Sequence, residues 1–329
     1  MINVFIDIRM RVSSLLFIGL LWMFSCNQVN LEPVDPSTEP TEALQVVKTR
    51  FPNASDVVFK AIMPGDVWEV AFSNTNEKYL SLVDRTKMFE TFKLRPDTLP
   101  QPLTSFMPRS TFKGGTFSDN GEDISTYQDY NWRNRLLYNL NGTDYSFEIV
   151  RNRAAPYTPV VVNFENYKYH IHLSKVDDFP AAVRDFLSVR QNVTFRAGEA
   201  RVKLNFEKHY WMQVSFMLYG KEALGYLLLD EKGKLIWSSK DFNLPPNYDA
   251  SSNIDTLPEP IQNYLDQTPE LATFNSKPEK IYKWRSEYEG VVSYYLSMQQ
   301  GDWTTPSELC ELYFDQDGNL LNRRAFVSF

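Results

Sequence analysis

The sequence has few of the residues that build metal centres and disulfide frameworks, and it has no excess of positive charge. Its 329 residues include 2 Cys and 3 His. Two cysteines cannot form a disulfide framework, and three histidines leave little room for a histidine-rich metal centre. With 34 Lys and Arg against 41 Asp and Glu, the net charge of -7 argues against a nucleic-acid-binding protein, which needs clustered cations.

Catalytic and cofactor motifs are missing as well. The chain contains no GxSxG, HExxH, CxxC, GxGxxG or GxxxxGK(S/T) motif. The segment Asp315 to Gly318 is not an EF-hand loop, because its glycine is at the fourth position and Phe326 stands at the twelfth. We therefore expect a protein that is not an enzyme and that uses no cofactor.

The chain is rich in aromatic side chains, with 23 Phe, 18 Tyr and 7 Trp. A chain of this composition can bury enough apolar surface to fold, so intrinsic disorder is excluded for most of it.

Residues 1–25 predict the signal peptide of a bacterial lipoprotein. Arg9 and Arg11 precede the apolar stretch 12–24, which is shorter than the roughly 20 residues of a membrane-spanning helix but has the length of a signal-peptide core. The stretch ends in Met23-Phe24-Ser25-Cys26, which resembles a lipobox. That resemblance implies that Cys26 is acylated and becomes the first residue of the mature chain. A buried helix or an uncleaved anchor is the alternative.

Residues 26–41 predict a flexible tether, because they are rich in Pro and carboxylates and have no apolar period. Asn27 follows the cysteine in place of the aspartate that retains many lipoproteins in the inner membrane. We therefore expect a lipid-anchored protein of the bacterial cell envelope, held at the outer membrane on its periplasmic or surface face.

The rest of the chain shows an internal repeat. The segments 99–107, 179–187 and 257–265 each pair an apolar residue with Pro and then place apolar residues at helical spacing, starting 80 and 78 residues apart. Alternating strands follow, with Asp-x-x-Gly turns at 230–233 and 315–318. This order predicts an α+β fold of tandem modules, each a helix packed on a roughly four-stranded antiparallel sheet.

Four such modules are expected, at 42–96, 97–176, 177–254 and 255–329. Asp84 and Asn163 take the place of the turn aspartate in the first two. The Gly-, Ser- and Asp-rich residues 108–131 are expected to be a long insertion in the second. The alternative is one large irregular α+β domain.

This pattern resembles the PepSY-like, beta-lactamase-inhibitor-like domains of exported bacterial proteins. The resemblance rests on the element Arg50-Phe51-Pro52-Asn53-Ala54, the aromatic strand 68–72 and the Asp-x-x-Gly turns. The first module departs from the pattern, because Lys87 replaces the turn glycine. The resemblance implies a helix-on-sheet module in periplasmic or surface lipoproteins without established catalysis, and it offers enzyme inhibition only as an analogy of architecture.

Strand alternation indicates where a partner binds. In 207–218, the residues Tyr210, Met212 and Val214 form a core face, which leaves alternate residues on the opposite face. In 291–298 the same reasoning leaves Ser293, Tyr295 and Ser297 facing outward. In 308–315 it leaves Leu309, Glu311 and Tyr313 facing outward. Trp and Tyr suit binding because they combine a large area with a polar group. The predicted partner-binding residues are His209, Trp211, Gln213, Tyr295 and Tyr313. The alternative is that neighbouring modules cover these faces.

Two further features of the sequence bear on metal binding and on thiol chemistry. His170 and His172 share one strand face and are weak candidates for a metal site, although a solvated polar face is the favoured interpretation. Cys310 alternates with Leu312 and Phe314, which predicts a buried, inert thiol.

Together these patterns predict an envelope lipoprotein that binds a protein or peptide partner through aromatic sheet faces. A glycan-binding accessory lipoprotein is the alternative, because Trp and Tyr also stack on sugar rings. A hydrolase that brings together Asp and Glu from different modules is a third hypothesis, since such pairs leave no local spacing rule.

Overall fold

The computed structural model describes residues 40–63, 65–96, 98–100, 103–104, 107–125, 131–152, 161–190, 193–218, 221–238, 256–275, 281–301 and 307–328. Glu42–Phe329 form one compact unit. The predicted signal peptide, Cys26 and nearly all of the tether lie outside the described residues. Among the helices that are described, none is long and apolar enough to cross a membrane.

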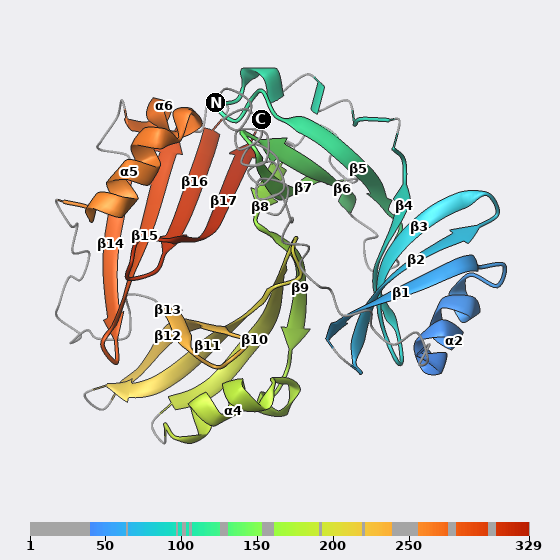
Figure 1. The fold of residues 1–329 in the computed structure, drawn as a ribbon, viewed down its shortest axis with the longest axis horizontal. Helices are drawn as coiled ribbons and strands as arrows, with labels where there is room; N and C mark the ends of the chain where they lie inside the picture. The colour runs from blue at the N-terminus through green and yellow to red at the C-terminus, as the bar shows by residue number, and fades with distance from the viewer. Residues whose placement is uncertain are drawn as a thin grey trace, which may run out of the picture. The chain divides into compact units, whose positions relative to one another are not determined.

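Twelve strands form one antiparallel sheet, in which neighbours along the chain pair up to β8 and the last four strands then follow in reverse (Figure 1). In spatial order the strands are β1 (Ser55–Met63), β2 (Val67–Asn74), β3 (Glu77–Asp84), β4 (Met88–Leu94), β5 (Thr116–Asp123), β6 (Asn131–Leu140), β7 (Thr143–Asn152), β8 (Val161–Glu165), β17 (Leu320–Ser328), β16 (Ser307–Phe314), β15 (Val291–Gln300) and β14 (Ile281–Tyr288).

Five strands form a second antiparallel sheet. In spatial order they are β13 (Leu235–Ser238), β12 (Lys221–Asp230), β11 (Lys208–Leu218), β10 (Val193–Lys203) and β9 (Tyr167–Leu173). The chain passes from the twelve-stranded sheet to this one at Asn166, between β8 and β9. The Asn166 Oδ1 accepts a hydrogen bond from the Arg323 N–H at 2.9 Å, which ties the crossover to β17.

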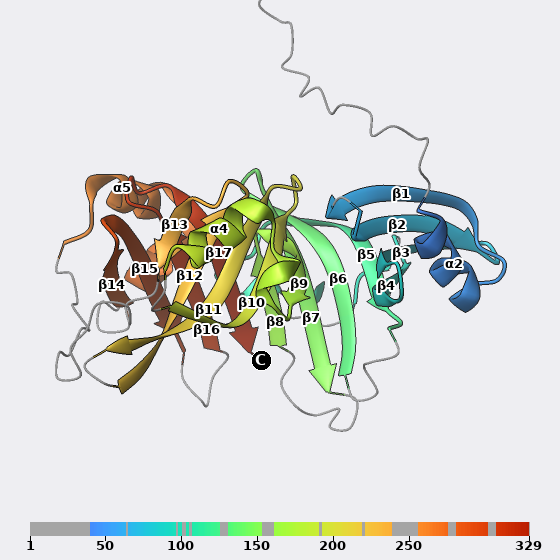
Figure 2. The same ribbon diagram turned by 90° about the horizontal axis from the view of Figure 1, so that it is seen from below.

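Short helices cover parts of both sheets (Figures 1 and 2). Helix α2 (Thr41–Arg50) packs Ala43 and Val47 into a core with β2 and β3. Helix α4 (Ala181–Ser188) packs against the five-stranded sheet, and α5 (Glu259–Gln267) against the opposite end of the twelve-stranded sheet. The remaining helical turns are η1 (Met107–Arg109), η2 (Val176–Asp178), η4 (Pro269–Leu271) and α6 (Ala272–Asn275).

The predicted fold class is wrong, although two of its local elements are confirmed. Helices lie at α4 and α5, where the periodicity of 179–187 and 257–265 predicts them. The structure is nevertheless mostly β, and it is not a tandem array of helix-on-sheet modules. The β4–β5 and β8–β17 pairs join strands into one sheet that the repeat pattern assigned to separate modules. When two edge strands pair, their backbone N–H and C=O groups form hydrogen bonds that separate small sheets would leave unmade. Such pairing leaves no pattern in the local sequence.

The Asp-x-x-Gly turns are confirmed, and they show why two glycines are required. Gly233 and Gly318 have φ of 74° and 80°, in the left-handed region that favours glycine. The carboxylates of Asp230 and Asp315 accept backbone N–H groups of their own turns at 2.8–3.0 Å. A Cβ at either glycine would collide with the first turn of α4 or α5. Each turn therefore lies directly under a helix.

Two expectations for the second quarter of the chain are also wrong. The expected insertion at 108–131 contains β5, which pairs with β4 and β6 and is part of the sheet. Asn163 lies inside β8 and pairs with Phe326, so it does not occupy a turn. The polar composition of β5 hid this strand, because its sequence TFSDNGED has one large apolar residue and no apolar alternation.

Candidate functional site

A small cavity lies between the outer face of the five-stranded sheet and the twelve-stranded sheet. Its volume is about 250 Å³. We call it the aromatic cavity. The five-stranded sheet contributes Tyr167, His170, Arg201, Trp211, Tyr226, Leu228 and Trp237, and the twelve-stranded sheet contributes Glu165, Tyr313, Asn322 and Arg324.

Strand alternation places the first wall of the cavity. Tyr210, Met212 and Val214 are 0–3% exposed in the core under α4, as the alternation of β11 predicts. Trp211 therefore faces the other way. Its ring stacks on that of Tyr226 from β12, with centroids 5.2 Å apart.

Gln213 lies two residues along the same face, and its Nε2 donates a hydrogen bond to the Tyr226 hydroxyl at 3.2 Å. Of these two predicted residues, Trp211 lines the cavity, and Gln213 holds the hydroxyl of the lining residue Tyr226.

A row of rings from β14–β16 leads to the opposite wall. Trp284 stacks on Tyr295 with centroids 4.9 Å apart, and Tyr295 contacts Tyr313 at 5.0 Å. Tyr313 then meets Trp237 of the other sheet edge-on at 5.4 Å. The Tyr295 hydroxyl donates to Glu311 at 2.6 Å, which fixes the middle of the row. Tyr313 therefore lines the cavity, and Tyr295 supports it from behind.

The two sheets are joined beside the cavity by backbone and hydroxyl groups. The Ser238 N–H at the end of β13 donates to the Ser293 Oγ at 3.1 Å, and that hydroxyl donates to the Ser238 carbonyl at 3.2 Å. Both serines are fully buried. The faces that alternation assigns to solvent thus cover one another in part, and the cavity is the space left between them.

A chain of charged groups forms the rim. The His170 ring bonds Glu165 at 2.7 Å and Glu199 at 3.3 Å, and the Arg201 Nε donates to the same Glu199 at 3.1 Å. Burial alone would lower the pKa of His170, but the hydrogen bonds to the two carboxylates outweigh it and raise the pKa to about 9. His170 is therefore cationic at neutral pH.

Two hydrogen-bond donors at the cavity have no partner in the described part of the chain. They are the Trp237 Nε1 and the Arg324 Nε, and both atoms are buried. The cross-strand neighbours of Arg324 are Glu165 and Glu311, which are engaged by His170 and by the two tyrosines. A buried donor without an acceptor costs about 1–3 kcal/mol.

One predicted binding residue is not at the surface. His209 is 3% exposed, and its ring bonds the Tyr167 hydroxyl at 2.8 Å and Glu207 at 2.9 Å. Burial lowers its pKa to about 4, so it is neutral at physiological pH. Alternation places it on the correct face, but Tyr167 from β9 covers it. His209 therefore supports the wall and cannot contact a partner.

The two candidate metal ligands belong to different places. His170 lines the aromatic cavity, whereas His172 lines a second cavity. Within the described residues, no group of three or more His, Cys, Asp or Glu side chains is placed to hold a metal ion. Cys310 is fully buried, as predicted, and burial raises the pKa of its thiol to about 11.

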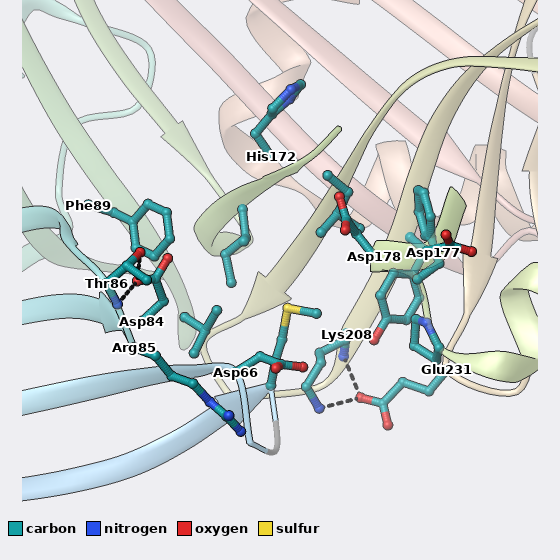
Figure 3. A pocket seen from close by; sticks show the side chains of 17 residues that line it. Asp66, Asp84, Arg85, Thr86, Phe89, His172, Asp177, Asp178, Lys208 and Glu231 are labelled. Atoms are coloured by element: carbon teal, nitrogen blue, oxygen red, sulfur yellow. Dashed lines mark hydrogen bonds and ion pairs between the residues drawn. The ribbon is translucent and has the colours of Figure 1, made fainter. Parts of the chain in front are cut away.

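The second cavity is larger, about 750 Å³, and we call it the acidic cavity. Turns after β1, β3 and β12 and the segment around η2 surround it, and Figure 3 shows its polar side chains. Its carboxylates are Asp66, Asp84, Asp177, Asp178 and Glu231, and its floor includes the buried side chains of Val67, Ile171, Leu173, Phe179 and Tyr210.

Three of these carboxylates are already engaged by their own or a neighbouring turn. Asp84 accepts the Lys87 N–H at 2.7 Å, and Asp178 accepts the Ser174 N–H at 2.9 Å. Glu231 accepts both the backbone N–H and the Nζ of Lys208, at 3.0 and 2.9 Å (Figure 3). These three carboxylates stabilise the loops around the cavity. This structural role explains why they are there, and no ligand is needed to explain them.

Sequence reasoning missed eight of the eleven residues that line the aromatic cavity. They are Glu165, Tyr167, Arg201, Tyr226, Leu228, Trp237, Asn322 and Arg324. Tyr226 and Arg324 alternate with buried residues of β12 and β17, so the same period-2 reading would have found them. Trp237 belongs to a strand of only four residues, which is too short to show a period. Comparison with known protein families, curated proteins and solved structures gives no match.

Proposed function

We propose that the protein is a lipid-anchored, non-enzymatic protein of the bacterial cell envelope that binds a protein or peptide partner at the aromatic cavity. The observation that carries this proposal is the cavity itself. Trp and Tyr rings from two sheets line one concave space. Concave sites of this kind, with aromatic walls and a few polar groups, are where proteins bind ligands.

The size of the cavity favours a small part of a larger partner. At about 250 Å³ it lies just below the roughly 300–1,000 Å³ of sites that enclose a whole small molecule. It has room for one large side chain. Binding energy at protein interfaces concentrates in such anchors, which fill desolvated pockets rimmed by weaker contacts. Trp211 and Tyr313 are the walls that an inserted side chain would contact.

Glycan binding has less support. Sugar rings bind on open aromatic faces, but here Trp211 stacks on Tyr226 and Trp284 stacks on Tyr295, so each ring has one face covered. Tyr282 is 49% exposed at the end of the row, and it is the ring that a glycan would reach. Binding of the isolated protein to a glycan array, lost in Tyr282→Ala, would support this alternative.

Membrane attachment rests on the sequence Ser25-Cys26 and the tether that follows. Acylation at Cys26 with more than one chain would give stable anchoring, because a single chain binds membranes only marginally. Mass spectrometry of the mature N-terminal peptide tests this directly. Diacyl or triacyl Cys26 supports the anchor, and an unmodified cysteine or an intact residue 1–25 segment contradicts it.

The binding proposal is tested by capture of a partner from envelope fractions, comparing the protein with Trp211→Ala, Tyr313→Ala and the control Tyr282→Ala. The two cavity variants should lose at least about tenfold in capture, since an anchor contact is worth 2 kcal/mol or more. The control substitutes an exposed ring outside the cavity. Equal capture by all three variants would contradict the proposal. Thermal unfolding of each variant shows whether it is folded.

A further inference from the structure

The turn between β6 and β7 contains a dipeptide that can react with itself. The chain has two Asn-Gly pairs, Asn120-Gly121 and Asn141-Gly142. In such a pair the backbone nitrogen of the glycine can attack the side-chain amide of the asparagine, because glycine has no Cβ to hinder the approach. The attack needs a backbone and an amide that can move, so the structure around each pair decides whether it reacts.

Asn141-Gly142 is exposed at the tip of a hairpin. The two residues form the whole loop between the paired residues Leu140 and Thr143, and their φ angles are 52° and 82°. Positive φ at both positions is typical of a two-residue type I′ turn, for which Asn-Gly is the preferred sequence. The Gly142 N–H donates to the Asn139 Oδ1 at 3.2 Å, in an exposed hydrogen bond. The turn can therefore open without disturbing the sheet.

Asn120-Gly121 lies inside β5 and is held on several sides. Asn120 is 4% exposed, its Nδ2 donates to the Thr98 carbonyl, and its Oδ1 accepts the Nδ2 of Asn134 at 2.8 Å. Gly121 pairs with β4 on one side and β6 on the other. This pair can react only when β5 leaves the sheet, which costs more free energy than opening an exposed turn. It is therefore an internal reference for Asn141.

The side chain of Asn141 connects the exposed turn to a buried ion pair. Its Nδ2 donates to the Oε2 of Glu270 at 2.7 Å. Glu270 lies in η4 and is 8% exposed, and its Oε1 accepts the Nη1 of Arg323 at 2.7 Å. Arg323 is 1% exposed, and a buried guanidinium is tolerated only with an anionic partner of this kind. A change at Asn141 therefore acts on a carboxylate that the core requires.

We propose that Asn141 is a site of spontaneous deamidation, and that the product weakens the contact between the β6–β7 turn and Glu270. The backbone nitrogen of Gly142 attacks the Cγ of Asn141, and Nδ2 leaves as ammonia with the proton of the attacking nitrogen, which gives a cyclic imide. Water then opens the imide to aspartate or isoaspartate. Either product replaces the donor that faces Glu270 with a second carboxylate, so an attraction becomes a repulsion.

Peptide mapping by mass spectrometry measures the reaction in the full chain. The protein is incubated at neutral pH, folded and in urea, and conversion at Asn141 and Asn120 is followed over time. In the folded protein Asn141 should convert at least about tenfold faster than Asn120, because only its turn opens easily. In urea the two rates should agree within about threefold, since neither pair is then held by the fold. Equal rates in the folded protein, or no conversion of Asn141, would overturn the assignment.

Two substitutions measure the consequence for stability by urea unfolding. Asn141→Gly removes the donor and keeps a residue that adopts positive φ readily, whereas Asn141→Asp is one product of the reaction. Asn141→Gly should lower the equilibrium constant for folding about tenfold, and Asn141→Asp at least about fivefold further, because only Asn141→Asp leaves two carboxylates in contact. Equal stability of the two variants would overturn the proposed repulsion with Glu270. Neither experiment depends on partner capture, so the proposed function stands or fails separately.

Discussion

The aromatic cavity and the acidic cavity differ in how their polar groups are satisfied. The volume of the acidic cavity is about 750 Å³, three times the volume of the aromatic cavity at about 250 Å³. Yet Asp84, Asp178 and Glu231 accept hydrogen bonds from neighbouring loops, so they have a structural role that explains them. In the part of the chain that is described, the Trp237 Nε1 and the Arg324 Nε, both from residues that line the aromatic cavity, have no acceptor. The rings that line the aromatic cavity are therefore what favours it as the proposed binding site, although it is the smaller of the two cavities.

Among the substitutions that compare the two cavities, Trp237→Ala in the aromatic cavity is expected to have the largest effect on stability and on partner capture. This substitution removes the ring that meets Tyr313 across the two sheets, and we expect it to lower the free energy of unfolding by about 3 kcal/mol and to abolish partner capture. Urea unfolding followed by circular dichroism measures the first effect. Tyr282→Ala, at an exposed ring, should change stability by no more than about 0.5 kcal/mol. A similar loss in both variants would show that Trp237 does not join the sheets.

A smaller effect is expected from Asp84→Ala in the acidic cavity. The variant loses the acceptor for the Thr86 and Lys87 N–H groups, which should cost about 1 kcal/mol of stability and leave partner capture unchanged. Asp84→Asn retains an acceptor oxygen and should lose less. Reduced capture by a folded Asp84→Ala protein would break the comparison, since it would make the acidic cavity part of the binding site.

A third expected effect, similar in size to that of Asp84→Ala, is the pH dependence that His170 at the aromatic cavity gives to the stability of the protein. Its pKa is raised to about 9, above the unfolded value near 6.5, so the folded state holds the proton more tightly. The resulting stability is fully present below pH 6.5 and is lost as the pH rises through 9. Because the side chain is 37% exposed, solvent screening reduces the contribution to about 1 kcal/mol.

The measurement is urea unfolding at pH 6 and pH 9.5 for the protein and for His170→Gln. The stability difference between the two should be about 1 kcal/mol larger at pH 6 than at pH 9.5. A difference that does not change with pH would show that Glu165 and Glu199 do not hold the proton on His170.

The sequence predicts local features of this protein well and its long-range pairing poorly. The alternation of β11 identifies Met212 and Val214 as core and puts Trp211 on the opposite face, because side-chain direction follows from backbone geometry alone. The same alternation cannot say what lies over that face. The prediction that His209 is accessible is wrong for this reason, because the hydroxyl of Tyr167, 42 residues away, covers it.

The continuous sheet illustrates the same limit. Helix periodicity and Asp-x-x-Gly turns locate α4, α5 and the turns beneath them, since each depends on residues close in the chain. The β8–β17 pair joins Val162 to Val327, and its hydrogen bonds use backbone groups that every residue carries. The sequence of each strand therefore does not identify the strand with which it pairs. The aromatic cavity lies between two sheets, so its lining residues cannot be identified from the sequence of either sheet alone.

Partner capture compared between Trp211→Ala and Asp84→Ala tests the central claim most directly, because each variant alters one cavity and leaves the other intact. We predict that Trp211→Ala loses at least about tenfold in capture and that Asp84→Ala retains the full level, with both proteins folded at the assay temperature. Full capture by Trp211→Ala together with loss in Asp84→Ala would contradict the account and move the binding site to the acidic cavity.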